Sequence, residues 1–490
     1  MTHGVEVEDA DRYESRTDIS VFEDQGYQKG LGNRQVQMIA IGGAIGSGLF
    51  LGAGGRLNSA GPALMLVYAV AGVFAFLVVR AMGEMVMHRP TSGSFVSYSR
   101  EFIGEKAAFF AGWMYFLNWA CSGMADVTAA AVYVKFFYPN IAQWIPALIA
   151  LAVVLAVNLV SVKIFGELEF WFAAIKVVTL VAFMVIAIVV LIRRTQVAPG
   201  FATGPQLIFE HGGFFPAGLF AVLMILQGVV FAYAGVEMVG VAAGETDNPR
   251  KVIPKAVNSV GWRIAIFYVG SVLLLVMLLP TSMYSSAGSP FVTVLSKLGI
   301  PAVAGIMNIV LITAALSSVN SGLYATGRVL RSLAFNGSAP RVLGKMSRHG
   351  VPYAGVLLTG FIYLIGVFLN LKLPHDAFEI TIEFSAVGII GMWCMIMIAH
   401  LAFYRATQAG LLPRPEFRMP WAPYSNYVTV AFLIFVLAMT WFNGKTGRFI
   451  IYSLPVIVLL LVAGWFACRK GVERIRQEGG AHHHSHSPLE

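Results

Sequence analysis

The chain has 490 residues, of which 57% are hydrophobic and only 12% are charged, and its mean hydropathy is +0.73. Soluble domains carry about twice that share of charged residues, so the composition excludes soluble enzymes and DNA-binding modules. The 34 basic and 25 acidic residues leave a formal charge of +9, which in an integral membrane protein is typical of cytoplasmic loops rather than of nucleic-acid binding.

The first 35 residues are polar. Four of the first eleven are acidic and no apolar run precedes residue 36, so this segment is not a secretory signal and the first span must direct insertion. We expect residues 1–35 to be a cytoplasmic segment, residues 36–469 the transporter domain, and residues 470–490 a cytoplasmic tail. The HHHSHS run in that tail is read as a disordered end, with a metal-binding tract or a cloning remnant as the alternative.

Between these segments, apolar stretches of span length recur regularly. At about 20 residues per crossing, they predict an all-α membrane protein with twelve transmembrane helices. The stretches lie near residues 36–57, 62–82, 106–137, 144–163, 168–192, 214–243, 259–280, 301–333, 352–372, 380–403, 424–443 and 448–469.

An even number of spans places both termini on one side of the membrane, and the basic residues indicate which side. Of the 34, Lys176 lies inside a span and eight belong to the odd-numbered connections. These eight are Arg56, Lys135, Arg193, Arg194, Lys297, Lys372, Lys445 and Arg448. The remaining 25 lie on the side of the termini, which the positive-inside rule assigns to the cytoplasm.

Two spans are interrupted by glycine, the first at IGGAIGSGLF (41–50) and the sixth at FAYAGVEMVG (231–240). Glycine-broken helices at matching positions of two halves indicate an inverted-repeat transporter whose substrate site lies between the breaks. In the alternative, Gly42 and Gly46 form a GxxxG surface for helix packing. The acidic Glu237, four residues after Tyr233, favours the broken-helix reading.

The breaks suit a small zwitterion. The half-helix after a break offers free amide groups and a positive dipole end to a carboxylate, while freed carbonyls before it accept hydrogen bonds from an ammonium. Gly46, Ser47 and Gly48 allow a close backbone approach, and Ser47 adds a hydroxyl group. Phe231 and Tyr233 flank Ala232, where they predict either an aromatic gate or ordinary core packing.

Over nearly its whole length the chain resembles the amino acid permeases of the amino acid, polyamine and organocation superfamily, and is most similar to bacterial L-asparagine permeases. Two of the segments that carry the resemblance are GNRQVQMIAIGGAIGSGLFLGAG (32–54) and LITAALSSVNSGLYATGRVLRS (311–332). Others are HRPTSGSFVSYSREFIGEKAAFFAGWMYFLNWA (88–120), FGELEFWFAAIKV (165–177), GGFFPAGL (212–219), AGETDNPRKVIPKAVNSV (243–260) and TSMY (281–284). One segment departs: SGMADVTA (122–129) is more similar to the D-serine, D-alanine and glycine permeases of the same family.

The resemblance implies a five-plus-five inverted repeat with broken first and sixth helices, and proton symport. It assigns the substrate carboxylate to the backbone around Ser47 and Gly48. It assigns the ammonium to carbonyls near Ile41 to Ala44 and Phe231 to Ala234. Glu237 resembles a sixth-span glutamate that related permeases use for substrate or proton binding, and Lys176 resembles a fifth-span lysine that takes the cation position of sodium-coupled relatives.

Charges inside a span are candidates for function, because insertion costs at least about 2.5 to 3.5 kcal/mol each. Lys176 either joins Ser317 and Ser318 of the eighth span in proton coupling or extends to the cytoplasmic face. Glu237, if buried, exchanges a proton or bonds a neighbouring helix. Asp126 is equally balanced between function and structure. Asn118, Asn158, Asn308 and Asn320 are expected to bond helices to one another.

The sequence therefore predicts proton-coupled uptake of a small neutral amino acid, most closely L-asparagine, across the cytoplasmic membrane. The partners are the amino acid, protons and the lipid bilayer. D-serine, D-alanine or glycine transport, amino acid exchange, sodium symport and a transporter-like nutrient receptor are the alternatives. No HExxH, GxSxG or Walker A pattern is present, and the three cysteines have no CxxC spacing, so no enzyme activity, cofactor or metal is expected.

Overall fold

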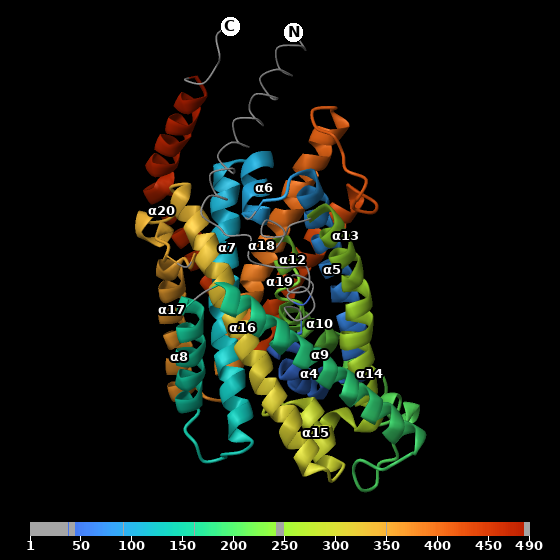
Figure 1. The fold of residues 1–490 in the computed structure, drawn as a ribbon. Coiled ribbons are helices and arrows are strands. Elements are labelled where there is room, and N and C mark those ends of the chain that lie inside the picture. Colours follow the sequence, from blue (N-terminus) through green and yellow to red (C-terminus); the bar gives the residue numbers. More distant parts are fainter. Residues whose placement is uncertain are drawn as a thin grey trace.

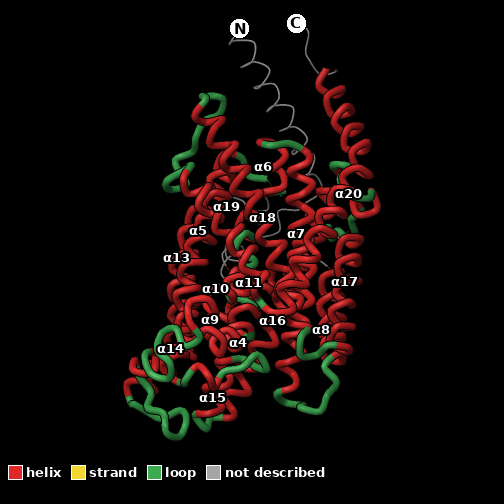
Figure 2. The backbone as a smooth tube through the Cα atoms, turned by 180° about the vertical axis from the view of Figure 1, so that it is seen from behind, coloured by secondary structure: helices red, strands yellow, loops and turns green. Residues whose placement is uncertain are grey.

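The computed structural model describes residue 38 and residues 45–91, 93–160, 162–241, 249–348 and 350–484, without the side chains of 162–165, 241 and 476–484. Within these ranges the regular structure is helical, apart from one isolated bridge between Ala198 and Phe201. The long helices run roughly along a common axis (Figures 1 and 2). The prediction of an all-helical protein is thus confirmed for the described part of the chain.

Helices occupy each of the stretches expected from the sequence. The first half contains α3 (Ser47–Phe50), α4 (Gly52–Ala60), α5 (Leu64–His88), α6 (Ser94–Phe102), α7 (Glu105–Lys135), α8 (Trp144–Val160), α9 (Val162–Ile192), α10 (Gly218–Met224), α11 (Leu226–Ala232) and α12 (Met238–Val241). The second contains α13 (Pro249–Arg263), a π-helical turn (Ile264–Gly270), α14 (Ser271–Leu278), α15 (Pro290–Lys297), α16 (Pro301–Phe335), α17 (Tyr353–Lys372), α18 (Ala377–Gln408), α19 (Tyr424–Met439) and α20 (Gly444–His484).

Eight helical stretches in the described ranges are long and apolar enough to cross a membrane, judged by length and composition. They are Gly52–His88, Gly166–Ile192, Pro249–Leu278, Pro301–Phe335, Tyr353–Lys372, Ala377–Gln408, Tyr424–Phe442 and Gly444–Ile475. The first and second predicted spans run together in one of these stretches. The chain is therefore a multi-pass membrane protein, while twelve spans and their inverted repeat stay predictions.

Helix α7 packs against α16, α17 and α18, and small residues make these contacts close. A Cβ atom added to Gly388 of α18 would lie 2.5 Å from the backbone nitrogen of Asn118 in α7. Likewise, a Cβ atom on Gly123 of α7 would lie 1.9 Å from the ring of Tyr363 in α17. Lipid gives helices little hydrophobic reason to associate, so such close packing supplies the attraction that holds α7 in the centre.

The outer surface is apolar, as a bilayer requires. In the most apolar stretch of α20, only 6% of the residues are buried inside the protein, and Leu459 and Leu460 are each 66% exposed. In Figure 1 the C-terminal end of α20 projects at the end of the molecule opposite α15. The breaks predicted from glycine lie between these two ends of the molecule.

Candidate functional site

Within the first predicted span, a helix begins at Ser47. Gly46 has extended backbone angles (φ −127°, ψ −165°), and its carbonyl accepts the amides of Leu49 and Phe50. The earliest amide groups of a helix have no acceptor inside it, so Ser47 and Gly48 stand at an amino-terminal end that attracts anions. Ile41 and Ala44, predicted to supply carbonyl groups, lie outside the described residues.

The sixth span is interrupted between α11, which ends at Ala232, and α12, which begins at Met238. Gly235 turns the chain there with φ +92°, a left-handed conformation that glycine adopts without steric cost. The turn carries its own backbone hydrogen bonds, including Ala234 N to Phe231 O (2.9 Å). The predicted interruption of the sixth span is therefore present in the structure, whereas that of the first span stays a prediction, because residues 39–44 lie outside the described ranges.

The two breaks meet around a small cavity. A Cβ atom on Gly48 would lie only 2.6 Å from the Cα of Ala232, so the two backbones are in contact. The cavity has a volume of about 20 Å³, which is room for the centre of one water molecule. Its lining residues are Gly46, Ser47, Gly48, Trp119, Ser122, Asp126, Phe231, Ala232, Ala234 and Ser318.

Asp126 of α7 supplies the charge in this lining. Its side chain is 3% exposed, and its Oδ1 accepts a hydrogen bond from the hydroxyl group of Ser47 over 2.6 Å. Together with the amides at Ser47, the carboxylate offers a small zwitterion one partner for each of its charged ends. Asp126 was evenly balanced between structure and function in the sequence, and its place beside the first break favours function.

Lys176 of α9 is completely buried, so the alternative in which its ammonium reaches the cytoplasmic face is wrong. Its Nζ donates to the Oγ of Ser317 in α16 over 3.0 Å. Ser317 donates in turn to the carboxylate of Glu169, with 2.8 and 2.9 Å to the two oxygens. Lys176 also interacts electrostatically with Asp126, which links this polar group to the cavity.

The two adjacent serines of α16 have different surroundings. Ser317 is fully buried in the Lys176 group, whereas Ser318 lines the cavity, where its Oγ would lie 3.2 Å from a Cβ atom on Gly46. Neighbouring residues of a helix point about 100° apart, and here the two serines face different groups. The predicted pairing of both serines with Lys176 is met by Ser317 alone.

Tyr233 and Glu237 are both buried outside the cavity lining. The Tyr233 hydroxyl donates to the carbonyl of Tyr68 over 2.6 Å, and its ring packs 4.6 Å from that of Tyr268. Glu237 Oε2 accepts the Gly235 amide over 3.2 Å, while its Oε1 has no hydrogen-bond partner among the described residues. Of the two predicted gate aromatics, only Phe231 lines the cavity. A direct role for Glu237 in substrate binding stays a prediction.

Two helix breaks around a cavity with a charged side chain are the arrangement that the resemblance to amino acid permeases implies. Comparison with known proteins identifies the family of the chain. The family profile "Amino acid permease" matches residues 35–477. The chain belongs to the amino acid permease family. Proteins of this family are permeases and not enzymes.

Its relatives match this permease along almost their full length. An L-asparagine permease of Streptomyces coelicolor is 57% identical over 451 residues, 92% of each chain. An L-asparagine permease of Escherichia coli is 54% identical over 454 residues, covering 92% of this chain and 91% of the relative. L-asparagine permease 2 of Mycobacterium tuberculosis is 54% identical over 463 residues, 94% of each chain.

The intramembrane asparagines of the permease bond helices to one another, as expected. Asn158 of α8 donates to Asn320 of α16 over 2.6 Å, and Asn308 of α16 donates to the carbonyl of Tyr133 in α7 over 2.5 Å. Asn118 of α7 accepts a hydrogen bond from Ser385 of α18 over 2.8 Å. These bonds hold the helices around the cavity in register.

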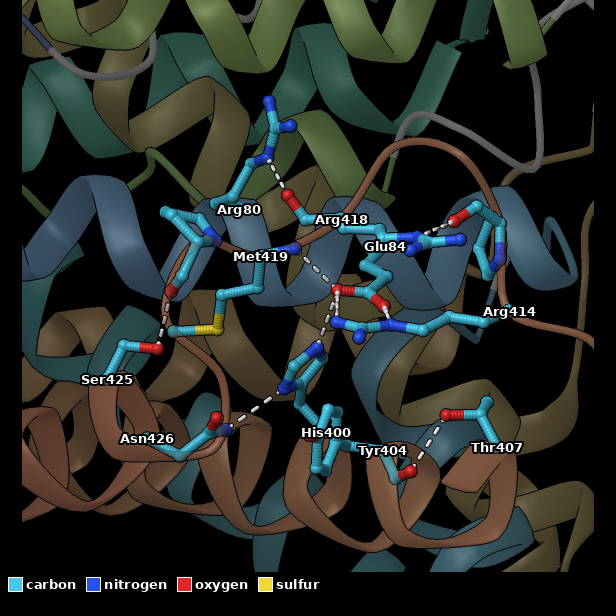
Figure 3. A network of polar contacts seen from close by, with 12 residues as sticks. Arg80, Glu84, His400, Tyr404, Thr407, Arg414, Arg418, Met419, Ser425 and Asn426 are labelled. Atoms are coloured by element: carbon cyan, nitrogen blue, oxygen red, sulfur yellow. Dashed lines mark hydrogen bonds and ion pairs between the residues drawn. The ribbon is translucent and has the colours of Figure 1, made fainter. Parts of the chain in front are cut away.

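A second polar cluster of the permease, which we call the α5–α18 clasp, comprises Glu84, His400, Arg414, Met419 and Asn426 (Figure 3). Glu84 and His400 are fully buried. Glu84 accepts hydrogen bonds from Arg414 Nε (2.7 Å), the Met419 amide (2.5 Å) and His400 Nε2 (3.0 Å). The clasp joins α5 and α18 to the loop before α19.

The other ring nitrogen of His400 fixes its tautomer. Asn426 Nδ2 lies 3.0 Å from His400 Nδ1 and also donates to the Met397 carbonyl, which orients the amide. Because an amide nitrogen only donates, Nδ1 is the acceptor and Nε2 carries the hydrogen directed to Glu84. The clasp is therefore complete with a neutral histidine.

One buried charge was misplaced by the sequence analysis. Arg56 was counted in the first connection, but it lies within α4 and is only 6% exposed. A signal was present in the sequence: Gly48, Gly52 and Arg56 recur every four residues and so share one helix face. Because the two glycines that precede the arginine on this face have no side chains, they leave space along the face for the long side chain of Arg56.

Proposed function

We propose that this permease takes up L-asparagine, and with lower preference other small neutral amino acids, together with a proton. The observation that carries the proposal is the cavity between the two breaks, which is lined both by the first residues of α3 and by the carboxyl group of Asp126. The names of the full-length relatives support asparagine as the preferred amino acid.

In the proposed bound state, the substrate carboxylate accepts hydrogen bonds from the amides at Ser47 and Gly48. The ammonium group bonds to Asp126 and to carbonyls at the two breaks. Among these, the carbonyl of Ala232 accepts the Tyr268 hydroxyl over 2.8 Å, which leaves one of its two lone pairs for the ammonium. A cavity of about 20 Å³ is too small for asparagine, and binding therefore requires the breaks to separate.

Lys176 is the proposed proton-coupling group, with Ser317 as its immediate partner and Glu237 as a second proton-binding candidate. A buried ammonium already fills the position where a sodium ion would bind, which argues against sodium symport. Its proton links α9 and α16 to the Asp126 side of the cavity. One proton driven by about 100 mV supplies roughly 2.3 kcal/mol, and each pH unit adds about 1.4 kcal/mol, which suffices for accumulation.

The proposed topology is twelve spans in the cytoplasmic membrane, the first ten forming a five-plus-five inverted repeat. Residues 1–35 and 470–490 are cytoplasmic in this proposal, and 36–469 form the transporter. The excess of basic residues on the side of the termini supports this orientation, and remains when buried Arg56 is removed from the count.

A second candidate is transport of D-serine, D-alanine or glycine. The segment 122–129 departs from the asparagine permeases in that direction, and two of its residues, Ser122 and Asp126, line the cavity. A residue that lines the cavity contacts the substrate and sets its preference. The two candidates therefore differ at the place where specificity is decided.

The deciding experiment is uptake of labelled asparagine into proteoliposomes with an imposed pH or sodium gradient. We expect accumulation driven by an inward proton gradient and none by sodium alone. Competition by unlabelled D-serine, D-alanine or glycine stronger than by asparagine would favour the second candidate. Uptake only into vesicles preloaded with amino acid would identify an exchanger, and binding without any uptake a nutrient receptor.

A further inference from the structure

Arg56 is a buried cation beside the first break. It lies two turns beyond Gly48 on the same helix face, and its Nη1 donates to the Gly48 carbonyl over 3.2 Å. A charge placed in a span costs at least about 2.5 to 3.5 kcal/mol by insertion scales. An exposed arginine would not carry this cost, so the groups around Arg56 must offset the free energy of burying its charge.

Two glycines make the seat for this guanidinium group. A Cβ atom on Gly52 of α4 would lie 2.1 Å from Nη1, and one on Gly228 of α11 would lie 2.2 Å from Nη2. No larger residue fits at either position while Arg56 keeps its place. The guanidinium thus fills the space between the outer half of the first span and the sixth span.

A third helix, α18, contributes a buried carboxyl group to the surroundings of Arg56. Glu383 of α18 is 3% exposed and interacts electrostatically with Arg56. Its Oε1 accepts Asn443 Nδ2 over 2.5 Å, and its backbone carbonyl accepts the side chain of Gln227, the neighbour of Gly228, over 2.9 Å. Arg56, Gln227 and Glu383 therefore bring polar groups of α4, α11 and α18 together in one polar layer.

This polar layer contacts the cavity lining through one atom, the carbonyl oxygen of Gly48. The Gly48 carbonyl faces the Arg56 guanidinium and, at 3.5 Å, the Tyr68 hydroxyl, while Gly48 itself lines the cavity. Arg56 is not among the lining residues. Its effect on a bound solute must therefore pass through the position of Gly48.

We infer that Arg56 is a positioning residue, which fixes the Gly48 backbone at the first break in the geometry that receives the substrate once the breaks have separated. The inference rests on the proposed function in that the breaks form the substrate site. Loss of the Arg56 contact frees the Gly48 carbonyl, so the backbone that receives the substrate is no longer held in one geometry. Substrate affinity then falls, while the helices stay inserted.

The test displaces Arg56 without changing its charge. In Gly228→Ala the added methyl group takes the position of Nη2, and the flexible arginine moves in preference to the helix backbone. Gly261→Ala is the matched control, because a Cβ atom there has no neighbour within 4 Å. Arg56→Met removes the charge, and Arg56→Lys keeps it without the planar fork.

For asparagine uptake we expect Gly228→Ala and Arg56→Met each to raise KM at least about tenfold, with a smaller rise for Arg56→Lys and none for Gly261→Ala. Because both changes break the same contact, the double variant should be no worse than the single ones. Wild-type KM in Gly228→Ala, or fully additive effects in properly folded protein, would overturn the inference.

A second readout needs no substrate, so it separates this inference from the proposed function. Ser318→Cys places a thiol in the cavity lining, on a background in which Cys121, Cys394 and Cys468 are replaced by alanine. We expect a membrane-impermeant thiol reagent to label it at least about fivefold faster with Gly228→Ala than with Gly261→Ala. Equal labelling rates would refute the positioning role even if the permease transports a different amino acid.

Discussion

At the scale of single residues, the structure distinguishes a charge placed to bind the substrate from charges that hold the surrounding helices. Asp126 lines the cavity, Lys176 lies behind it with Ser317 and Glu169, and Arg56 lies beyond it. All three are buried in spans. Because the three charges lie at different distances from the cavity, we expect the removal of each to cause a different kinetic defect.

Lys176→Met preserves the apolar length of the side chain and removes its proton. We expect normal insertion, little change in asparagine binding, and loss of accumulation driven by an inward proton gradient, because the substrate contacts lie on other helices. Uptake by proteoliposomes with and without the gradient measures this. Wild-type accumulation in the variant would remove Lys176 from the coupling mechanism.

Asp126→Asn keeps the shape of the side chain and removes the charge opposite the substrate ammonium. We expect asparagine affinity to fall at least about tenfold, which is about 1.4 kcal/mol, as measured by equilibrium binding to purified protein. Glu210→Gln, on an exposed outer loop, serves as the charge-matched control. Unchanged affinity in Asp126→Asn would make the carboxylate a purely structural partner of Ser47.

At the scale of helices, contacts between broken and unbroken spans determine which movements are available. Gly48 lies against Ala232, so the inner surfaces of the first and sixth spans touch through backbone atoms. At another level of the bundle, the α5–α18 clasp ties two long helices to a loop. The first contact must open during transport, whereas the second holds its helices together.

Gly48→Val tests the contact between the breaks. A branched side chain there meets the Ala232 backbone, which cannot move aside as a flexible side chain could. We expect transport to be abolished and asparagine binding per folded molecule to be lost, with most of the protein still inserted. Retained binding in monodisperse protein would show that Gly48 serves packing alone.

Glu84→Gln tests the clasp. The substitution leaves Arg414 without its charged partner and turns one acceptor into a donor beside the Met419 amide. Breaking such buried hydrogen bonds costs about 1–3 kcal/mol, so thermal unfolding in detergent should shift to lower temperature. Glu416→Gln, at an exposed position of the same loop, should unfold as the parent does; an equal shift in both variants would contradict the clasp.

At the scale of the whole molecule, the proposed orientation predicts opposite accessibility of its two ends in the cell. Ser286 lies beside α15 and Gln408 lies at the end of α18, and both residues are exposed. The test replaces each of them with cysteine, as Ser286→Cys and Gln408→Cys. In intact cells, on a background without the native cysteines, an impermeant thiol reagent should label the first and not the second. The reverse pattern would invert the proposed orientation.

The sequence by itself determined the class of protein and the places where its helices break. Hydropathy requires a membrane, and the left-handed conformation of Gly235 turns the chain between α11 and α12 through a backbone preference that acts within a few residues. Such local signals need no knowledge of neighbouring spans. The match to amino acid permeases over nearly the whole chain follows from the same linear information.

Only the tertiary structure decided which side chains meet. Asp126 joins Ser47 from 79 residues away, Ser317 and Ser318 take separate roles, and Tyr233 turns into the core rather than toward the cavity. In a span that is apolar on all sides, hydropathy does not reveal which face points inward. The rotation of each helix is set by packing against its neighbours, and that packing buried Arg56 where the sequence suggested a loop.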